Sequence, residues 1–289
     1  MIASLSQIAM LALAQVGPFP SSSGAVPGVP EELANRPPPP AALQQAQDTP
    51  LAKCLTLASE QPQAALDYAQ GWREKSEGAL DLAQSAHCLG LAMVQLGRLE
   101  EAQKVFDLAA GEAPEDNLPY AARLTAMAAN TAMARGKPEE ALPLIDRAGG
   151  MAIAAEDKPL AAQLRVDLAR TLVALGRDTD ADRALAEARD ADAENGEAWL
   201  LSATMSRRMK RYGEAQQQIE RAGDLAPRDA AVGLEAGVIA ALSGREEDAI
   251  RSFQSVLLVA PGSYQAERAK GYLEQLGGEA PPVESTPTR

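Results

Sequence analysis

Apolar and polar positions follow one recurring order along the middle of the chain. Gly97 is followed five, nine, twelve and seventeen residues later by Ala102, Phe106, Ala109 and Pro114. Two adjacent glutamates lie between Gly97 and Ala102. Apolar residues at spacings of three and four, as from Ala102 to Phe106 and Ala109, lie on one face of an α-helix, and acidic residues favour its first turn. Proline cannot continue a helix, so the stretch predicts one helix between a turn and a proline.

The same order recurs in five consecutive segments, each with a further small residue seven positions before the turn. The five sets are Gly90, Gly97, Ala102, Phe106, Ala109 and Pro114; Ala129, Gly136, Ala141, Ile145, Ala148 and Ile153; Ala169, Gly176, Ala181, Leu185, Ala188 and Ala193; Ala203, Lys210, Ala215, Ile219, Ala222 and Pro227; and Gly237, Gly244, Ala249, Phe253, Val256 and Pro261. Self-similarity at such a period indicates a repeat array.

On these residues the segments resemble tetratricopeptide repeats. The resemblance implies an all-α fold, a right-handed α-solenoid of stacked antiparallel helix pairs. Small residues let the two helices of a pair approach closely, and the large residue fills the gap between neighbours. The array is expected over 49–276, with a degenerate pair at 49–82, full repeats at about 83–116, 122–158, 162–195, 196–229 and 230–263, and a cap helix at 264–276.

Two features depart from a regular array. The turn-to-turn spacings on either side of Gly136 are 39 and 40 residues, against 34 for the next two spacings. We therefore expect longer loops at 111–118 and 149–159. Pro143 falls within the second helix of its repeat, which predicts a kink or a later helix start.

Both ends of the chain differ from the array in composition. Residues 1–14 are mostly apolar and end in Ala12-Leu13-Ala14, which resembles a secretory signal with a small-x-small cleavage site. No Lys or Arg precedes Arg36, so a misassigned start or an ordinary apolar helix is the alternative. Residues 15–48, rich in Pro and Gly, predict a disordered linker, and residues 277–289 a disordered tail.

Charge and composition narrow the class of function. The formal net charge is -13 and the pI is near 4.7, which argues against nucleic-acid binding because that requires a basic face. No stretch is long and apolar enough to predict a transmembrane segment.

Catalytic chemistry has little support in the sequence. His87 is the only histidine, which excludes multi-histidine metal sites, and its neighbour Cys88 points in a different direction on a helix. No glycine-rich phosphate loop is present. We therefore predict a protein that is not an enzyme and has no catalytic, metal or cofactor site.

The two cysteines are one repeat period apart. Cys54 and Cys88 are separated by 34 residues, on the expected first helices of neighbouring repeats. Equivalent helices of adjacent repeats stack side by side, so the two could form a disulfide that staples the degenerate pair to the array. The alternative is two buried, reduced cysteines, as in the cytosol.

The resemblance also implies a concave face lined by the first helices, where members of the family commonly hold an extended peptide or a partner helix. Carried over by register, the groove residues are Leu91, Arg123, Asn130, Arg170, Leu200, Thr204, Arg207 and Arg208, accompanied by His87, Val94, Met133, Val173, Leu234, Val238 and Leu242. Arginine suits carboxylates, so an acidic or C-terminal carboxylate peptide is one hypothesis. Pairing of these arginines with carboxylates of the chain itself is the other.

These observations leave three functional readings. The first is a non-enzymatic interaction scaffold of the cell envelope, periplasmic or secreted, that binds a peptide or protein partner in its groove. The alternatives are a structural subunit that docks by its convex face or edges, and a cytoplasmic adaptor if the N-terminal segment is not cleaved.

Overall fold

The computed structural model describes residues 49–278. The signal-like segment, the linker at 15–48 and residues 279–289 of the expected tail lie outside the described residues. Between these limits every regular element is a helix, thirteen in all, α3 to α15, and there is no strand. The fold is all-α, as predicted.

The chain divides into two compact units, which are described separately. Unit 1 holds residues up to Asn117 together with Met127–Lys137, and unit 2 holds Leu118–Ala126 together with the chain from Pro138 onward. The helix α7, Leu118–Ala134, is therefore shared between them.

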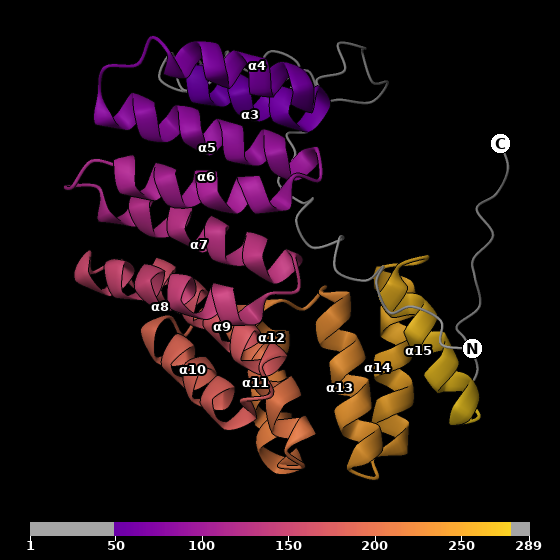
Figure 1. The fold of residues 1–289 in the computed structure, drawn as a ribbon. Coiled ribbons are helices and arrows are strands. Elements are labelled where there is room, and N and C mark those ends of the chain that lie inside the picture. The colour runs from indigo at the N-terminus through magenta and orange to yellow at the C-terminus, as the bar shows by residue number, and fades with distance from the viewer. Residues whose placement is uncertain (1–48, 279–289) are drawn as a thin grey trace, which may run out of the picture. The chain divides into compact units, whose positions relative to one another are not determined.

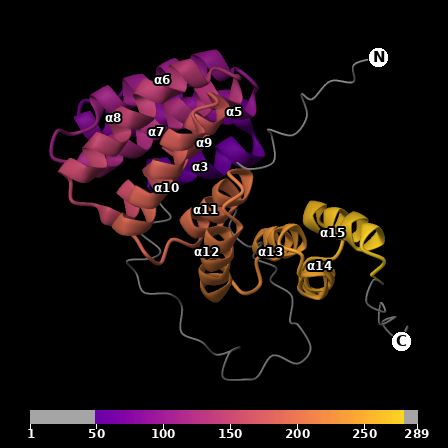
Figure 2. The same cartoon turned by 90° about the horizontal axis from the view of Figure 1, so that it is seen from below.

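Within each unit, helices that follow one another in sequence pack against one another (Figures 1 and 2). Unit 1 contains α3 (Pro50–Glu60), α4 (Pro62–Arg73), α5 (Ala79–Gln95) and α6 (Leu99–Glu112). Unit 2 contains α8 (Pro138–Ala154), α9 (Lys158–Ala174), α10 (Asp178–Ala191), α11 (Gly196–Arg208), α12 (Tyr212–Leu225), α13 (Ala230–Leu242), α14 (Glu246–Val259) and α15 (Tyr264–Gln275).

The turn position of every repeat adopts left-handed backbone geometry. Gly97, Gly136, Gly176 and Gly244 have φ between 70° and 74°, and Lys210 has φ 60°. In each case the next residue donates its N–H to the carbonyl five residues back, for example Arg211 to Ser206 at 2.8 Å. This is the hydrogen bond that closes a helix with a left-handed residue. The prediction that Lys210 occupies a glycine turn is confirmed.

The apolar positions of the repeat form the core. The small residues five and twelve places after each turn, and the large residue nine places after it, are all at most 2% exposed. Where the large residue is Phe106 or Phe253, the residue seven before the turn is glycine. A Cβ on Gly90 would lie 2.5 Å from Phe106 Cε1, and one on Gly237 would lie 2.3 Å from Phe253 Cε1. Elsewhere alanine accompanies Ile or Leu.

Prolines mark where three of the second helices end. The helices α6, α12 and α14 each end two residues before Pro114, Pro227 and Pro261. In α8 the corresponding residue is Ile153, which does not stop a helix, and α8 runs on to Ala154.

The longer spacings around Gly136 are absorbed mainly by helix, so the expected loop at 149–159 was wrong. α8 occupies residues up to Ala154, and only three residues separate it from α9. α7, α8 and α9 are each 17 residues long, against 14 for α10. Pro143 lies within α8, which begins at Pro138, so the proline does not delay the helix start.

An arginine follows the turn residue of four repeats and pairs with the acidic first turn of the second helix. Arg177 lies 2.7 Å from Asp180, Arg211 lies 3.0 Å from Glu214, and Arg98 and Arg245 make the same i,i+3 pair with Glu101 and Asp248. The acidic residues are thus stabilised both by the helix dipole and by a neighbouring cation.

Candidate functional site

A small apolar cavity in unit 1 brings together three of the residues expected in the groove, Leu91, Val94 and Asn130. It has a volume of about 110 Å³ and lies between the first helices α5 and α7, with α6 beneath. We call it the α5–α7 pocket; its lining is Leu91, Val94, Leu99, Phe106, Met127, Asn130, Thr131 and Ala134.

A second cavity, in unit 2, brings together four more of them, Arg170, Val173, Thr204 and Arg208. It has a volume of about 190 Å³ and lies between the first helices α9 and α11, with α10 beneath. We call it the α9–α11 pocket; its lining is Ala169, Arg170, Val173, Leu185, Leu201, Thr204, Met205 and Arg208.

The two pockets occupy equivalent positions of the repeat. Each lies between the first helices of consecutive repeats, and each is lined by the large residue nine places after a turn, Phe106 in one and Leu185 in the other. The sequence identified these two residues as core, and both are at most 2% exposed. The sequence did not predict that these two side chains would also line a cavity.

The pockets also contain residues that the register argument missed. These are Leu99, Met127, Thr131 and Ala134 in the α5–α7 pocket, and Ala169, Leu201 and Met205 in the α9–α11 pocket. Their signal in the sequence is weak, because small and apolar residues fill first and second helices alike.

Polarity inside the α5–α7 pocket comes from two side chains. The Thr131 hydroxyl donates to the Met127 carbonyl oxygen of its own helix at 2.7 Å. The half-buried Asn130 amide has no hydrogen-bond partner among the described residues. An amide of this kind offers both a donor and an acceptor to a ligand.

Four arginines predicted to face the groove are paired with carboxylates. Arg170 bonds Asp167 at 2.9 Å and also Glu197, and Arg208 Nη2 donates to both Asp178 oxygens at 3.0 Å. Burial alone would lower the pKa of Arg170, but the charges of Glu197 and Asp167 outweigh it and raise that pKa.

Arg207 and Arg123 are paired in the same way and line neither pocket. Arg207 Nε donates to Glu235 at 2.5 Å, and Arg123 Nη2 donates to Asp157 at 3.4 Å. The arginines therefore follow the second of the two hypotheses, in which carboxylates of the chain itself neutralise them.

Two other expected groove residues belong to packing. Leu200 is partly buried against the core formed by Ala203, Ile219 and Val232. His87 is 8% exposed and lies edge-on to Phe106, with ring centroids 6.3 Å apart. His87 is therefore not a groove-facing side chain, and burial lowers its pKa to about 4.

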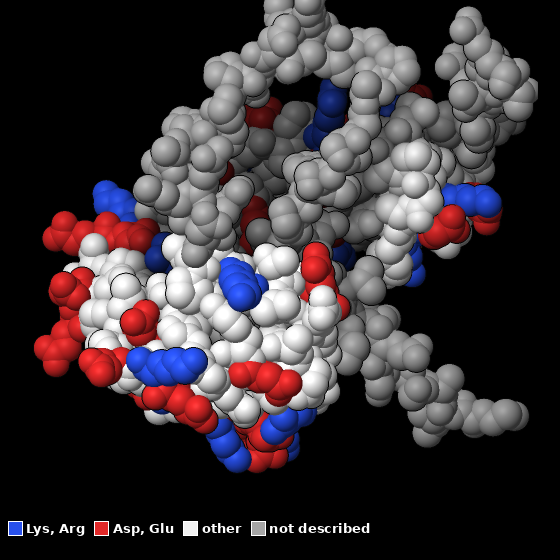
Figure 3. All heavy atoms as spheres, turned by 90° about the horizontal axis from the view of Figure 1, so that it is seen from above, with Lys and Arg blue, Asp and Glu red and all other residues white. Residues whose placement is uncertain are grey.

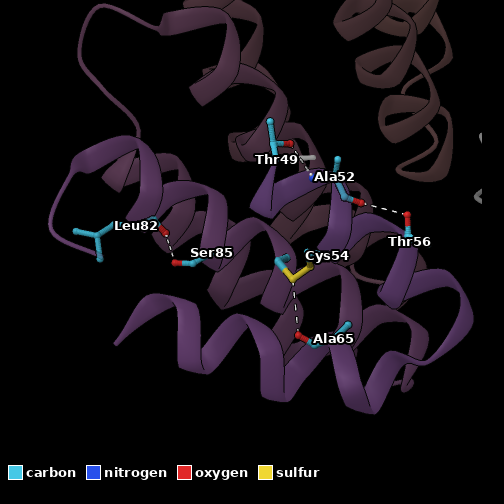
Figure 4. Close-up of a disulfide and its surroundings, with 8 residues drawn as sticks. Thr49, Ala52, Cys54, Thr56, Ala65, Leu82 and Ser85 are labelled. Carbon is cyan, nitrogen blue, oxygen red and sulfur yellow. Dashed lines mark hydrogen bonds between the residues drawn. A yellow bond between two sulfur atoms is a disulfide. The ribbon is translucent and has the colours of Figure 1, made fainter. Parts of the chain in front are cut away.

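Cys54 of α3 and Cys88 of α5 form a close pair of cysteines (Figure 4). Their Cα atoms are 5.9 Å apart, within the range that a disulfide requires, and both residues are fully buried. The Cys88 sulfur also lies 3.7 Å from the Ala65 carbonyl oxygen of α4. The pair thus lies where α3, α4 and α5 meet.

An ion pair holds α4, which forms a helix pair with α3. Arg73 of α4 bonds both carboxylate oxygens of Glu112 in α6, with Nη1 to Oε2 at 2.8 Å, and also donates to the Leu82 carbonyl oxygen at 3.0 Å. The hydrogen bond to Glu112 raises the pKa of Arg73.

A wider cavity of about 470 Å³ lies among α8, α9 and α10, but its charged side chains bind one another. Arg165 lies 2.9 Å from Glu187, and Arg183 lies 2.7 Å from Asp180. It offers few free groups to a ligand.

Charge is finely mixed on the face at the α3–α4 end of unit 1. Figure 3 shows acidic and basic side chains around a broad uncharged area, with no continuous basic patch on that face. Among residues 49–278, no helix has the length and apolar character needed to cross a membrane. The same residues hold no cluster of three or more His, Cys, Asp and Glu side chains placed to bind a metal.

No protein-family model and no curated protein matches the sequence. Solved structures do match. PilF of Pseudomonas aeruginosa aligns with a TM-score of 0.61 at 13% identity, over 80% of this chain and 99% of PilF. BtubC from P. vanneervenii aligns with a TM-score of 0.57 at 14% identity, over 84% of this chain and 98% of BtubC. YrrB, a TPR protein with an unusual peptide-binding site, aligns with a TM-score of 0.47 at 20% identity, over 65% of this chain and 92% of YrrB.

The chain has the fold of tetratricopeptide repeat proteins. Consecutive helix pairs, left-handed turn residues and the buried small and large positions all follow the order expected from the sequence.

Proposed function

We propose that the chain is a non-enzymatic interaction scaffold that binds an extended segment of a partner protein through the α5–α7 pocket. The observation that carries this proposal is the coincidence of Leu91, Val94 and Asn130 in one cavity. These residues were expected in a groove on repeat register alone, and the cavity is apolar apart from Asn130 and Thr131.

The chemistry of the pocket favours an extended segment over a helix. Its apolar lining suits an aliphatic or methionine side chain. The Asn130 amide beside it can donate to a main-chain carbonyl oxygen and accept from a main-chain N–H. A helix satisfies these groups internally, whereas an extended segment leaves them free. One segment can therefore use both the cavity and the amide.

Site-specific photo-crosslinking in the native cells tests the proposal. A photoreactive residue at Asn130 is expected to give a discrete adduct that disappears when Leu91 is replaced by Glu. A photoreactive residue at Leu108, which is 48% exposed on α6 and outside the pocket, is the control. Equal adducts from both positions, or an Asn130 adduct that survives Leu91→Glu, would argue for docking elsewhere.

We further propose that the protein acts outside the cytoplasm. The signal-like residues 1–14 and the buried Cys54–Cys88 pair support this, because disulfides persist in oxidising compartments. The intact mass of protein from native cells, with and without reduction before alkylation, tests it. We expect residues 1–14 to be absent and two thiols to react only after reduction; a full-length chain with two reactive thiols would contradict export.

A further inference from the structure

The charges around the α9–α11 pocket determine which partner residues can lie beside it. Arg170 and Arg208 line the cavity, and three carboxylates bond to them, those of Asp167, Asp178 and Glu197. Each arginine is therefore already neutralised by the carboxylates that bond to it. We propose that the α9–α11 pocket holds an apolar side chain of the partner that is flanked by a lysine or arginine.

The inference rests on the proposed function and narrows its partner. The α9–α11 pocket has apolar walls formed by Val173, Leu185, Leu201 and Met205, and a volume of about 190 Å³. An apolar protein cavity of roughly 150 Å³ accommodates benzene. The pocket is therefore large enough for one leucine, methionine or phenylalanine side chain.

An acidic flanking residue would meet groups that are already occupied. Arg170 donates to two carboxylates and Arg208 to one. To bind either arginine, a ligand carboxylate must displace one of these or approach it closely, and like charges repel.

A basic flanking residue can bind the same carboxylates without displacing the arginines, whose charges they neutralise. Glu197 and Asp178 are 41% and 40% exposed and keep part of their carboxylate surface open to solvent, whereas Asp167 is 13% exposed. A carboxylate has about four acceptor positions, so it can keep its arginine and accept a further donor. The net charge of -13 adds a longer-range attraction for basic segments.

A random 12-residue phage-display library selected on the full-length protein provides the probe. We expect selected peptides to combine Leu, Ile, Met or Phe with Lys or Arg within two positions. Filling the pocket mouth with Thr204→Trp should remove this class. Selection of peptides rich in Asp or Glu by the same pocket would overturn the inference.

Neutralising each partner of one ion pair in turn gives the sharper comparison. For a synthetic peptide of the selected class, measured by fluorescence anisotropy, Glu197→Gln should weaken binding about two- to five-fold. Arg170→Gln should tighten binding, and raising the salt concentration should weaken it. An acidic ligand would show the opposite order, so the reverse result, or equal effects of both variants, sinks the proposal. Both variants change half-exposed side chains, and circular dichroism would verify their helix content.

The outcomes separate this inference from the function on which it rests. Peptides lost on Leu91→Glu but without any preference for basic residues would leave the scaffold function standing and remove the charge rule. Failure to select any peptide that depends on either pocket would count against both.

Discussion

The residue seven positions before each turn is matched to the large residue of the following helix. Gly90 and Gly237 face the rings of Phe106 and Phe253, at distances where a Cβ would meet ring carbons within 2.6 Å. Glycine weakens a helix by about 1 kcal/mol relative to alanine. The two glycines are therefore explained by packing, because only a residue without a Cβ leaves room for the ring.

Replacing Gly90 with alanine should lower the free energy of unfolding. The overpacking penalty is roughly 1–3 kcal/mol, which exceeds the gain of about 1 kcal/mol in helix propensity. Adding Phe106→Leu should restore part of the loss, because it recreates the alanine and leucine pair of another repeat. Urea denaturation of both single variants and the double variant measures this coupling.

Gly71 supplies the control for that experiment. It lies in α4 with nothing within 4 Å of an added Cβ. Gly71→Ala should therefore leave stability unchanged or raise it slightly. A loss at Gly71 as large as that at Gly90 would show that the ring contact is not the cause.

His87 should make stability fall in mild acid. Burial lowers its pKa in the folded protein to about 4, from 6.5. Between these values the unfolded chain binds a proton that the folded chain does not, so stability is lost as the pH falls through this range. At pH 5 the loss from this group alone is about 2 kcal/mol, since one pKa unit corresponds to about 1.4 kcal/mol.

Unfolding in urea at pH 7.5 and pH 5 measures the effect of His87. His87→Gln removes the titrating group, so the variant should lose less stability between the two pH values than the natural protein. Carboxylates titrate in both proteins and cancel in the comparison. Identical pH dependence in the two would show that His87 ionises freely in the fold.

At the scale of elements, α3 and α4 are held by two separate devices. The Cys54–Cys88 pair, which we propose is a disulfide, links α3 to α5, and the Arg73–Glu112 ion pair links α4 to α6. End helices of a repeat array have only one neighbour, so they are the first to fray. In the chain-entropy model, closing a 34-residue loop stabilises by roughly 3–4 kcal/mol.

Reducing the disulfide should loosen this end of unit 1. Hydrogen exchange with and without a phosphine reductant should show faster exchange at 50–73 after reduction, with no change at α13 and α14. The doubly substituted Cys54→Ala/Cys88→Ala protein should exchange rapidly at 50–73 in both conditions. Equal protection of this segment before and after reduction would mean that packing and Arg73 hold the pair without the disulfide.

Helix length in this chain depends on single stop signals. Proline ends α6, α12 and α14, whereas Ile153 lets α8 continue. The loop at 149–159 was predicted from the turn-to-turn spacing of 40 residues, and Gly149 and Gly150 in that stretch also disfavour a helix. Packing of the 17-residue α8 overrode that weak local preference, as tertiary contacts commonly do.

At the scale of the whole molecule, the fold could be predicted because its determinants are local and repeated. A left-handed turn, an alanine and one large residue recur at fixed offsets, so five weak signals reinforce one another. The substitution at Lys210, whose φ is 60°, did not hide the pattern, since the other positions of that repeat kept their spacing.

The site was predictable only in part, for a physical reason. Register places Leu91, Asn130, Arg170, Thr204 and Arg208 on the helices that line the two pockets. The charge state of the pocket depends on partners that are distant in sequence: Glu197 lies 27 residues from Arg170, and Asp178 lies 30 from Arg208. No single-helix pattern shows these pairs, and our proposal of a basic flanking residue depends on them.

The matching of glycine with phenylalanine and of alanine with leucine or isoleucine also sets rules for recombining this protein. The segment α5–α6 and the segment α13–α14 carry the same combination, Gly90 with Phe106 and Gly237 with Phe253. Either could supply the interior of the other in a chimera. A crossover placed between the two helices of a pair, joining an alanine helix to a phenylalanine helix, would put a methyl group against a ring. Viable shuffling points therefore lie between repeats and not within them.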